Sequence, residues 1–408
     1  MHFQHLITAV AVFCQLAAVQ AAAIDSDLES RQKDNRARIT KYFEKQRARL
    51  KIVKTTKTPN GQEIDWIPIE SQGKIAAKPP KLEAPKSDLK QAEEIPLGEL
   101  ELKGADKGPP GTVPVLKQNL DFIDPDTTLE DLLRKVPPPS KSDQLDKRHT
   151  WDHWWAASGQ RVRNFGGQGQ FSCFDPTTEV NSDGSLLQIA VIKRPSKTQT
   201  VEAGWIKFRP LFGEGGHLFT YYTTCGHCVP DADNVGGWNE GVDGWVQIDD
   251  TIHPGTRFSP FSVIDGPQRK LWIVYQLFEG NWWLWVKDRW IGYYPASLFS
   301  AGGPSGTTLA TDSNEIQFYG EVFDSSERAG LTTTDMGSGR FANEHWQKSA
   351  YIHNLLYQSS SGPGNSNRLY NGNQLFFQSD PKRYTLEPQF GSSTSWDSYC
   401  WVGGPGKV

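Results

Sequence analysis

The chain has 408 residues, with 43 Lys and Arg against 47 Asp and Glu, so its formal net charge is −4. A slightly acidic chain lacks the basic surface on which nucleic-acid binding depends, and no nucleic-acid partner is expected. After the N-terminal segment, no run approaches the roughly 18 apolar residues of a membrane helix, so no membrane partner is expected.

The first 23 residues predict a signal peptide. A short apolar stretch over 6–18 is followed by small residues of the cleavage-site type over 19–23. The apolar stretch is too short to span a bilayer core of about 30 Å. We therefore expect residues 1–23 to be removed and the protein to be secreted to the extracellular space.

Residues 24–148, which we call the leader, differ in composition from the rest of the chain. The leader has 24 Lys and Arg, 22 Asp and Glu and one tryptophan, Trp66, whereas the other 14 tryptophans follow it. It is rich in Pro and poor in large apolar residues, which predicts a largely extended, partly helical segment with little core of its own. Helices are expected over 30–50 and over 126–135, the second with Thr127 or Thr128 as its N-cap.

A dibasic pair, Lys147-Arg148, stands where the composition changes. Such a pair in a secreted chain is typical of cleavage by a furin- or kexin-like processing protease, although dibasic pairs also arise by chance. Nothing before the pair looks like a complete folded domain, so its position favours a propeptide over a linker between domains. We expect the mature chain to be residues 149–408, a single domain.

Residues 149–408 predict an all-β fold. Short aromatic and β-branched runs are separated by Gly, Asp, Asn and Pro and do not alternate with helices, so an antiparallel β-sandwich of the jelly-roll kind is expected. The segment 341–357 hints at a helix but equally fits a strand after a loop. Strands are expected over 185–193, 201–209, 217–224, 244–249, 270–278, 282–288, 290–294 and 316–323.

Two of these runs contain a lone carboxylate, Glu202 and Glu321. A carboxylate facing a site of low dielectric constant is costly unless it is protonated, hydrogen-bonded or used in chemistry. Two of them close together could form an acid/base pair, in which one holds a proton and the other activates water. Alternation along a strand does not say which face is buried, so a surface glutamate remains the alternative for each.

An ordered series of motifs resembles the neprosin domain over about 185–354, and residues 403–406 resemble its usual end. The resemblance implies a secreted glutamic endopeptidase, made as a zymogen and active in acid, with a glutamate pair on a β-sandwich. In plant members it cuts after proline. The motifs are Glu202-Ala203-Gly204-Trp205, 218–223, Cys225 with Cys228, 244–247, Asn281-Trp282-Trp283-Leu284, 291–299, Gly320-Glu321-Val322 and 334–339.

The resemblance implies the roles of several residues and partners. Glu202 and Glu321 match the catalytic positions, and Trp205, Tyr319 and Trp282, in or beside the matching motifs, are the expected substrate contacts. Polypeptides are the implied substrates, the leader is the implied inhibitor, and neither a cofactor nor a metal is expected. A monomer is expected. Relative to plant members, an insertion over 229–242 follows Cys228, and we expect it to reshape the substrate site.

Four cysteines remain once Cys14 leaves with the signal peptide, which allows three disulfide connectivities. We expect Cys225 to pair with Cys228 and Cys173 with Cys400. A thioredoxin-like redox site at 225–228 is an alternative, but that motif works at a helix N-terminus, and here it follows a strand. A zinc site made by Cys225, His227, Cys228 and His217 is another, but it needs reduced thiols in an oxidising compartment.

The many tryptophans suggest two other functional classes. Trp282, Trp283, Trp285 and Trp290 are expected in the core, because large aromatic residues dominate sandwich interiors. Exposed aromatic rings would instead stack on sugars. A secreted glycoside hydrolase with paired carboxylates and a non-catalytic carbohydrate-binding β-sandwich are therefore the alternatives. Replacing Glu321 by Gln distinguishes them, because only a lectin would keep its function.

Overall fold

The computed structural model describes most of the leader and most of the mature chain. Residues 1–23, the pair Lys147 and Arg148, and the residues His227 and Cys228 lie outside the described part. The described residues are 26–75, 79–81, 93–94, 106–133, 135, 152–194, 198–226, 235–241, 243–325, 332–362, 366–372, 375–392 and 394–407.

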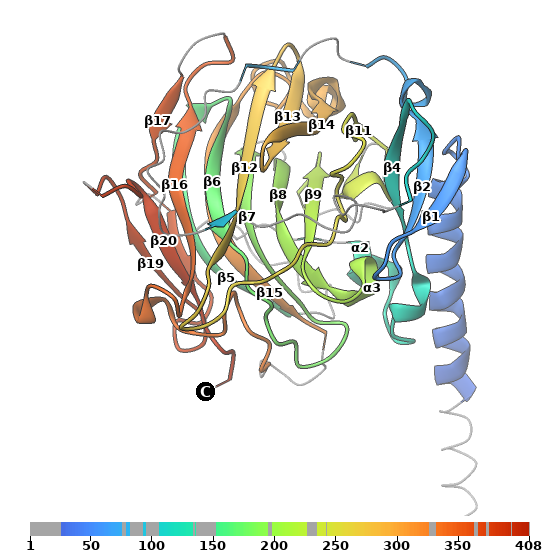
Figure 1. Cartoon of the computed structure of the whole chain (residues 1–408), viewed down its shortest axis with the longest axis horizontal. Coiled ribbons are helices and arrows are strands. Elements are labelled where there is room, and N and C mark those ends of the chain that lie inside the picture. Colours follow the sequence, from blue (N-terminus) through green and yellow to red (C-terminus); the bar gives the residue numbers. More distant parts are fainter. Residues whose placement is uncertain are drawn as a thin grey trace, which may run out of the picture.

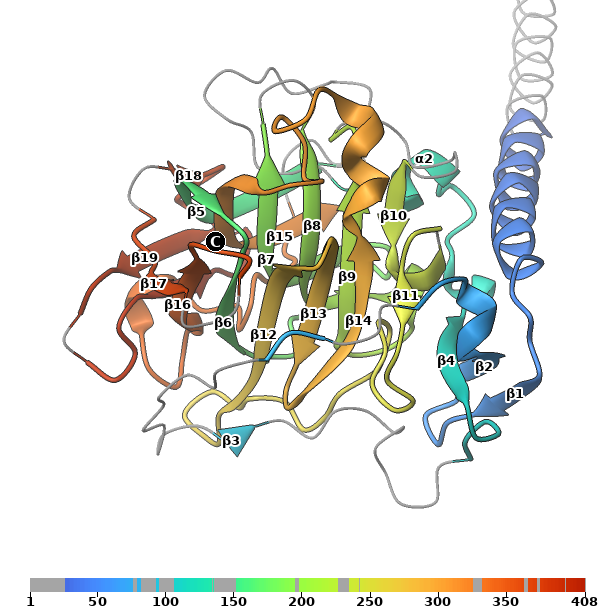
Figure 2. The same ribbon diagram turned by 90° about the horizontal axis from the view of Figure 1, so that it is seen from above.

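Two large sheets stack on one another after residue 151 (Figures 1 and 2). A seven-stranded sheet has the order β10-β9-β8-β7-β15-β5-β18, and its strands are antiparallel. A ten-stranded sheet has the order β11-β14-β13-β12-β6-β16-β20-β19, with β17 beside β16 and β3 beside β12. The expected all-β, antiparallel β-sandwich is thus confirmed. The strands of the sandwich are Asp152–Asn164 (β5), Gly166–Ser172 (β6), Gly184–Lys193 (β7), Gln199–Phe208 (β8), His217–Thr223 (β9), Gly236–Trp238 (β10), Val246–Gln247 (β11), Arg269–Phe278 (β12), Asn281–Val286 (β13), Arg289–Pro295 (β14), Ser313–Asp324 (β15), Ala350–Gln358 (β16), Asn367–Leu369 (β17), Leu375–Gln378 (β18), Thr385–Gln389 (β19) and Tyr399–Gly403 (β20), with β3 (Glu93–Glu94) from the leader.

Local sequence explains the order of these elements. Every run predicted as a strand contains one, and the ambiguous segment 341–357 gives a short 3-10 helix, Ala342–Glu344, and then strand β16. The turn between β12 and β13 has Glu279 at φ 46° and Gly280 at φ 73°. Two consecutive left-handed residues match the twist of a two-residue hairpin, and Gly adopts that conformation without strain. The other short helices are Arg209–Phe212 (α3) and the 3-10 turns Asn239–Gly241 and Ala296–Gly302.

The leader is more ordered than its composition suggested. It contains a charged helix over 26–47 and a three-stranded antiparallel sheet of β1, β2 and β4, in which Ile67, Val113 and Val115 form a small buried cluster. These three residues are a small core, as expected, and the other buried apolar side chains of the leader, such as Trp66 and Leu132, pack with those of the sandwich. Its other elements are β1 (Lys54–Lys57), β2 (Glu63–Pro68), β4 (Thr112–Lys117), α2 (Leu129–Leu133) and the 3-10 turns Ile69–Gln72 and Leu120–Phe122.

The helix expected over 126–135 is confirmed as α2. The Asp131 amide donates a hydrogen bond to Thr128 Oγ1 at 3.1 Å, so Thr128 is the N-cap. The longer helix over 26–47 is charged along its length, and among the described residues no helix is both long and apolar enough to cross a membrane.

The leader contacts both sheets of the sandwich. Helix α2 lies against the seven-stranded sheet, within one cluster of buried side chains from both parts. A strap, residues 72–75 and 79–81, follows the outer face of the ten-stranded sheet (Figure 2). Gln72 Nε2 donates to the Gln247 carbonyl at 2.8 Å, and Trp290 Nε1 donates to the Pro80 carbonyl at 3.0 Å. Further along, β3 pairs in parallel with β12.

Candidate active site

Strand register brings Glu202 and Glu321 to one face of the seven-stranded sheet. Glu202 of β8 lies opposite Ala190 of β7, and Glu321 of β15 lies opposite Leu186 of the same strand. Residues an even number apart on a strand point to the same face, as Ala190 and Leu186 do. Both glutamates therefore project from the same face, which we call the glutamate face. Both side chains are fully buried.

A lysine from the leader bridges the two carboxylates. Lys135 Nζ lies 2.6 Å from Glu202 Oε2 and 3.0 Å from Glu321 Oε2. One nitrogen atom thus lies within ion-pair distance of both oxygens, and no more than the sum of these two distances separates the oxygens. The lysine is only 2% exposed. The structure therefore brings the predicted pair together and adds a third charged residue that the sequence reasoning did not identify.

Neutral side chains complete the environment of Glu202. Thr200 Oγ1 donates to Glu202 Oε1 at 2.7 Å, and Gln188 Nε2 donates to Oε2 at 2.7 Å. The Tyr319 hydroxyl donates to the same Oε2 at 3.2 Å, so this predicted substrate contact does lie in the site. Donors that converge on a carboxylate fix its orientation.

His153 is the corresponding partner of Glu321. Its Nδ1 lies 2.9 Å from Glu321 Oε1, and its ring stacks on Trp155 with a centroid separation of 5.7 Å. Both residues belong to β5, directly after the predicted processing site. From the sequence, this stretch was expected only to begin the mature chain, and His153 was not predicted as part of the site.

The charges of the site are set by burial and by each other. Burial alone would raise the pKa of Glu321, but the Lys135 ammonium and His153 outweigh it and leave that pKa below its ordinary value. Burial would lower the pKa of Lys135, but Glu202 and Glu321 outweigh it and raise that pKa above 10.5. Burial and the two carboxylates raise the pKa of Tyr319 well above its usual range, so its phenol keeps its proton.

This arrangement can support acid/base chemistry on water once the lysine is absent. Two carboxylates close together cannot both ionise cheaply, so a pair without an ammonium shares one proton. The ionised member can then accept a proton from water while the other donates one. With Lys135 in place, its ammonium nitrogen lies within ion-pair distance of both carboxylates.

Trp205 and Trp282 do not reach the site, and the prediction that they bind substrate was wrong. Both are fully buried in the core between the two sheets. Their indole nitrogens donate to the carbonyls of Ser172 and Leu309, each at 2.8 Å. Trp205 stands three residues after Glu202 on one strand, and an odd separation directs a side chain to the opposite face. The family motif placed it near the glutamate in sequence only.

The expected pairing of Cys173 with Cys400 was also wrong, because both cysteines are free and buried. Strand β16 lies between the strands that lead to them, and its Ile352 is opposite both Phe171 and Cys400. Two strand spacings, about 9.5 Å, exceed the reach of a disulfide. Cys225 is disulfide-bonded, so its sulfur is not available as a zinc ligand.

We expect the mature chain to contain two free thiols. Burial raises the pKa of Cys173 well above its usual range and that of Cys400 to about 12, so both thiols should react slowly with iodoacetamide in the folded protein. Unfolding without a reductant should then allow alkylation of both. Peptide mass spectrometry measures this, and recovery of a peptide that links Cys173 to any other cysteine would contradict it.

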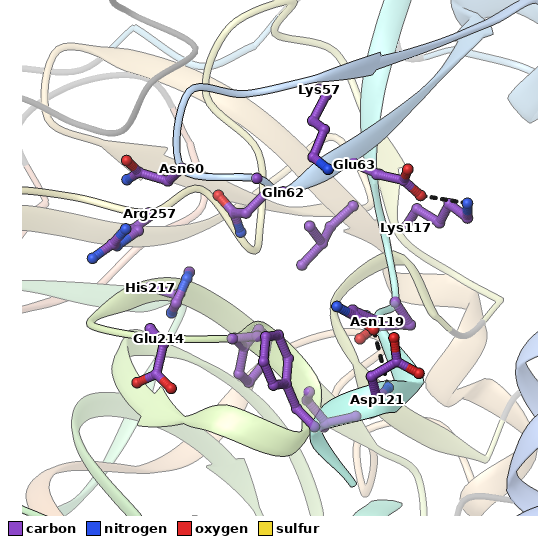
Figure 3. A pocket seen from close by; sticks show the side chains of 17 residues that line it. Lys57, Asn60, Gln62, Glu63, Lys117, Asn119, Asp121, Glu214, His217 and Arg257 are labelled. Atoms are coloured by element: carbon purple, nitrogen blue, oxygen red, sulfur yellow. Dashed lines mark hydrogen bonds and ion pairs between the residues drawn. The ribbon is translucent and has the colours of Figure 1, made fainter.

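A cavity of about 450 Å³ lies where the leader meets the sandwich (Figure 3). Leu116 and Phe122 of the leader line it on one side, and Phe212, His217 and Arg257 line it on the other. Neither the glutamates nor Lys135 line this cavity.

Comparison with known proteins gives one family and several solved structures. The model of the family described as Neprosin matches residues 181–405, more than half of the chain. Scytalido-glutamic peptidase, solved with a peptide-based transition-state analogue, is similar at 7% identity and a TM-score of 0.33, over 62% of this chain and 99% of that one. SCP-B, an eqolisin-family peptidase solved with the tripeptide Ala-Ile-His, is similar at 5% identity and a TM-score of 0.31, over 62% and 99%.

A third similar structure is CG-16, a homodimeric agglutinin from chicken liver, at 8% identity and a TM-score of 0.21, over 42% of this chain and all of that one. TM-scores this low support no argument about function, whereas the family model covers both glutamates and the strands that hold them. The chain belongs to the neprosin family, and it is a glutamic-type endopeptidase.

Proposed function

We propose that this chain is the precursor of a secreted endopeptidase that uses Glu202 and Glu321 to hydrolyse peptide bonds at acidic pH. One observation supports it most: two buried carboxylates, on strands β8 and β15 that flank β7, meet at a single point, and a leader residue occupies that point. Two buried carboxylates side by side are energetically unfavourable unless a cation or a shared proton compensates their charge. A fold that keeps such a pair therefore favours a use for it in chemistry after the cation leaves.

The proposed reaction divides the work between the two carboxylates. The ionised one takes a proton from a water molecule as that water attacks the scissile carbonyl. The protonated one polarises the carbonyl oxygen and then protonates the leaving nitrogen. The Tyr319 phenol, which keeps its proton and lies beside Glu202, is placed to donate a hydrogen bond to the negative charge that develops on that oxygen.

We further propose that the leader keeps the precursor inactive through Lys135. Because the pKa of Glu321 is depressed in this state, its ionic contact stabilises leader binding fully above the ordinary glutamate pKa of 4.5. The contribution is lost as pH falls through the depressed pKa, when the carboxylate takes a proton. Acid therefore weakens leader binding and also supplies the proton that the reaction needs.

The secreted chain is expected to begin near His149 after cleavage at Lys147-Arg148, and the leader's departure is expected to give activity. N-terminal sequencing of the secreted protein, combined with an assay before and after acid treatment, tests both points. A mature terminus far from residue 149, or full activity while the leader is still covalently attached, would refute this part of the proposal.

A peptide library tests the activity itself. The mature chain should cut peptides below about pH 4.5, the ordinary glutamate pKa, and leave a panel of polysaccharides intact. The cut sites, identified by mass spectrometry, also measure the preference for proline that the family resemblance implies. Turnover of the polysaccharides without peptide cleavage would replace the proposal with a glycoside hydrolase. An identical cleavage pattern from the Glu321→Gln variant would show that another site is responsible.

A further inference from the structure

Beyond the glutamates, the glutamate face continues as an aromatic surface. Phe208 of β8, Phe219 of β9 and Phe323 of β15 occupy positions of the same parity as Glu202 and Glu321, and Phe212 of α3 joins them. All four are buried, and the Phe208 and Phe323 rings meet edge to face at 4.8 Å. The surface therefore begins on the same strands as the glutamates.

Trp238 stands at the centre of this surface. Its ring centroid lies between 5.1 and 6.5 Å from those of four other aromatic side chains, and its side chain is 6% exposed. Trp238 of β10 is opposite Tyr221 of β9, which in turn is opposite Glu202. It thus lies two strands from the glutamate in the same row. Its neighbours are Phe208, Phe212, Phe219 and Tyr221.

This tryptophan comes from the insertion over 229–242 that sets the chain apart from plant members of the family. The described part of the insertion forms β10, an edge strand that widens the sheet on the side of Glu202. The insertion therefore adds a large apolar side chain to the glutamate face. Trp238 Nε1 is buried and has no hydrogen-bond partner among the described residues, so a donor is available there.

The leader covers this surface with leucines. Leu129, Leu132 and Leu133 of α2 belong to the same buried cluster as the aromatic side chains, and the spacing places the three on one helix face. They precede Lys135, the residue between the glutamates, by only a few positions. One short segment of chain thus fills the catalytic point with a cation and the neighbouring aromatic surface with aliphatic side chains.

We propose that Trp238, Phe208 and Phe212 form a subsite that selects a large aliphatic or aromatic side chain of the substrate, a few residues from the scissile bond. The inference rests on the proposed function. When the leader leaves, these aromatic side chains become exposed to water. An apolar side chain of the substrate that packs against them buries them again. A substrate carbonyl also gives the Trp238 indole nitrogen its missing acceptor.

The position of the selected residue follows from the leader's geometry. The five residues of α2 advance about 7.5 Å, because a helix rises 1.5 Å per residue. An extended peptide covers that distance with two or three residues at about 3.3 Å each. The selected side chain should therefore stand two or three residues from the cut, on one side of it only.

A pair of peptides and one variant test the proposal. The library should first show enrichment of large apolar residues at one such position. Two peptides that differ only there, with Leu or Ala, should then differ in kcat/KM by about 10- to 200-fold for the mature chain, the usual range for filling an apolar pocket. The Trp238→Ala variant should reduce this ratio to below about threefold while it still cleaves the Ala peptide.

Controls separate the subsite from general damage. Trp285→Ala removes a half-buried tryptophan from the other sheet and should keep the wild-type ratio. Trp238→Phe keeps an aromatic ring and should give an intermediate ratio, which provides a readout if the alanine variant does not fold. A wild-type library without apolar enrichment on either side, or an unchanged ratio in the Trp238 variants, would overturn the subsite. A mature chain that cuts no peptide at any acidic pH would overturn the proposed function as well.

Discussion

The Glu202→Gln and Glu321→Gln variants of the mature chain should each lose at least about 100-fold in turnover, the usual contribution of a general acid or base. Glutamine keeps the volume and most of the hydrogen bonds but can neither accept nor release the catalytic proton. The double variant should be little slower than either single variant, because residues that act as a unit are not additive. Steady-state rates on one peptide at acidic pH measure all three.

A matched control is Glu240→Gln. Glu240 also has a largely buried carboxyl, with its side chain 7% exposed, and burial raises its pKa, so glutamine imitates its neutral form. This variant should keep near-normal turnover. Wild-type activity should fall as pH rises, because the general acid loses its proton. Near-normal cleavage by Glu321→Gln in acid, or a neutral optimum abolished by a chelator, would refute the glutamate mechanism and indicate a metal site.

The second large effect is expected for Lys135→Met in the precursor. Methionine fills much of the same space but leaves both carboxylates without their ammonium, and loss of one partner of a buried ionic contact costs about 3–5 kcal/mol. After the dibasic cut, the leader should dissociate from the variant at least about 100-fold more readily at neutral pH. Peptide cleavage should then begin at a higher pH than in the wild type.

The measurement is the dissociation constant of the processed complex across the acidic range. In the wild type, leader binding should weaken as pH falls below the ordinary glutamate pKa of 4.5, whereas in Lys135→Met it should no longer weaken, because acid neutralises the carboxylates that this variant leaves without a cation. Lys107→Met is the control, because this half-exposed leader lysine bonds Thr251 at 3.0 Å and contacts neither glutamate. Equal affinities for the wild type and Lys135→Met at neutral pH would show that the lysine is not the source of inhibition.

The strands were predictable because their chemistry is local. Alternating apolar residues and glycine-containing turns are both visible within a few positions, as for the hairpin at Glu279 and Gly280. The two glutamates were identified through the ordered family motifs, since alternation leaves the buried face of β8 undecided. Trp205 is three residues from Glu202, and this odd spacing in sequence already indicates that the two side chains point to opposite faces of the strand. The wrong prediction for Trp205 came from its place in the same family motif as Glu202.

Lys135 was not predictable because the leader has 24 Lys and Arg and one lysine resembles another in sequence. The contact with the glutamates depends on how the leader docks, which is a property of the tertiary structure. One local signal was available: Lys135 directly follows a capped, leucine-rich helix, an unusual apolar stretch for the leader. The free Cys173 and Cys400 had no local signal, because the strand between them comes from a distant part of the chain.

The leader contacts the sandwich at the glutamates, through Lys135, and on the ten-stranded sheet, through the strap. These two contacts should depend differently on pH. The contact at Lys135 depends on an ionised carboxylate, whereas Gln72 and Pro80 bind through neutral groups that do not titrate. Acid should therefore break the Lys135 contact before it releases the strap. The strap would then hold Lys135 near the glutamates at a high effective concentration. A brief exposure to acid would then be reversible on neutralisation. Lasting activation would require the enzyme to digest the strap while the pH is still low.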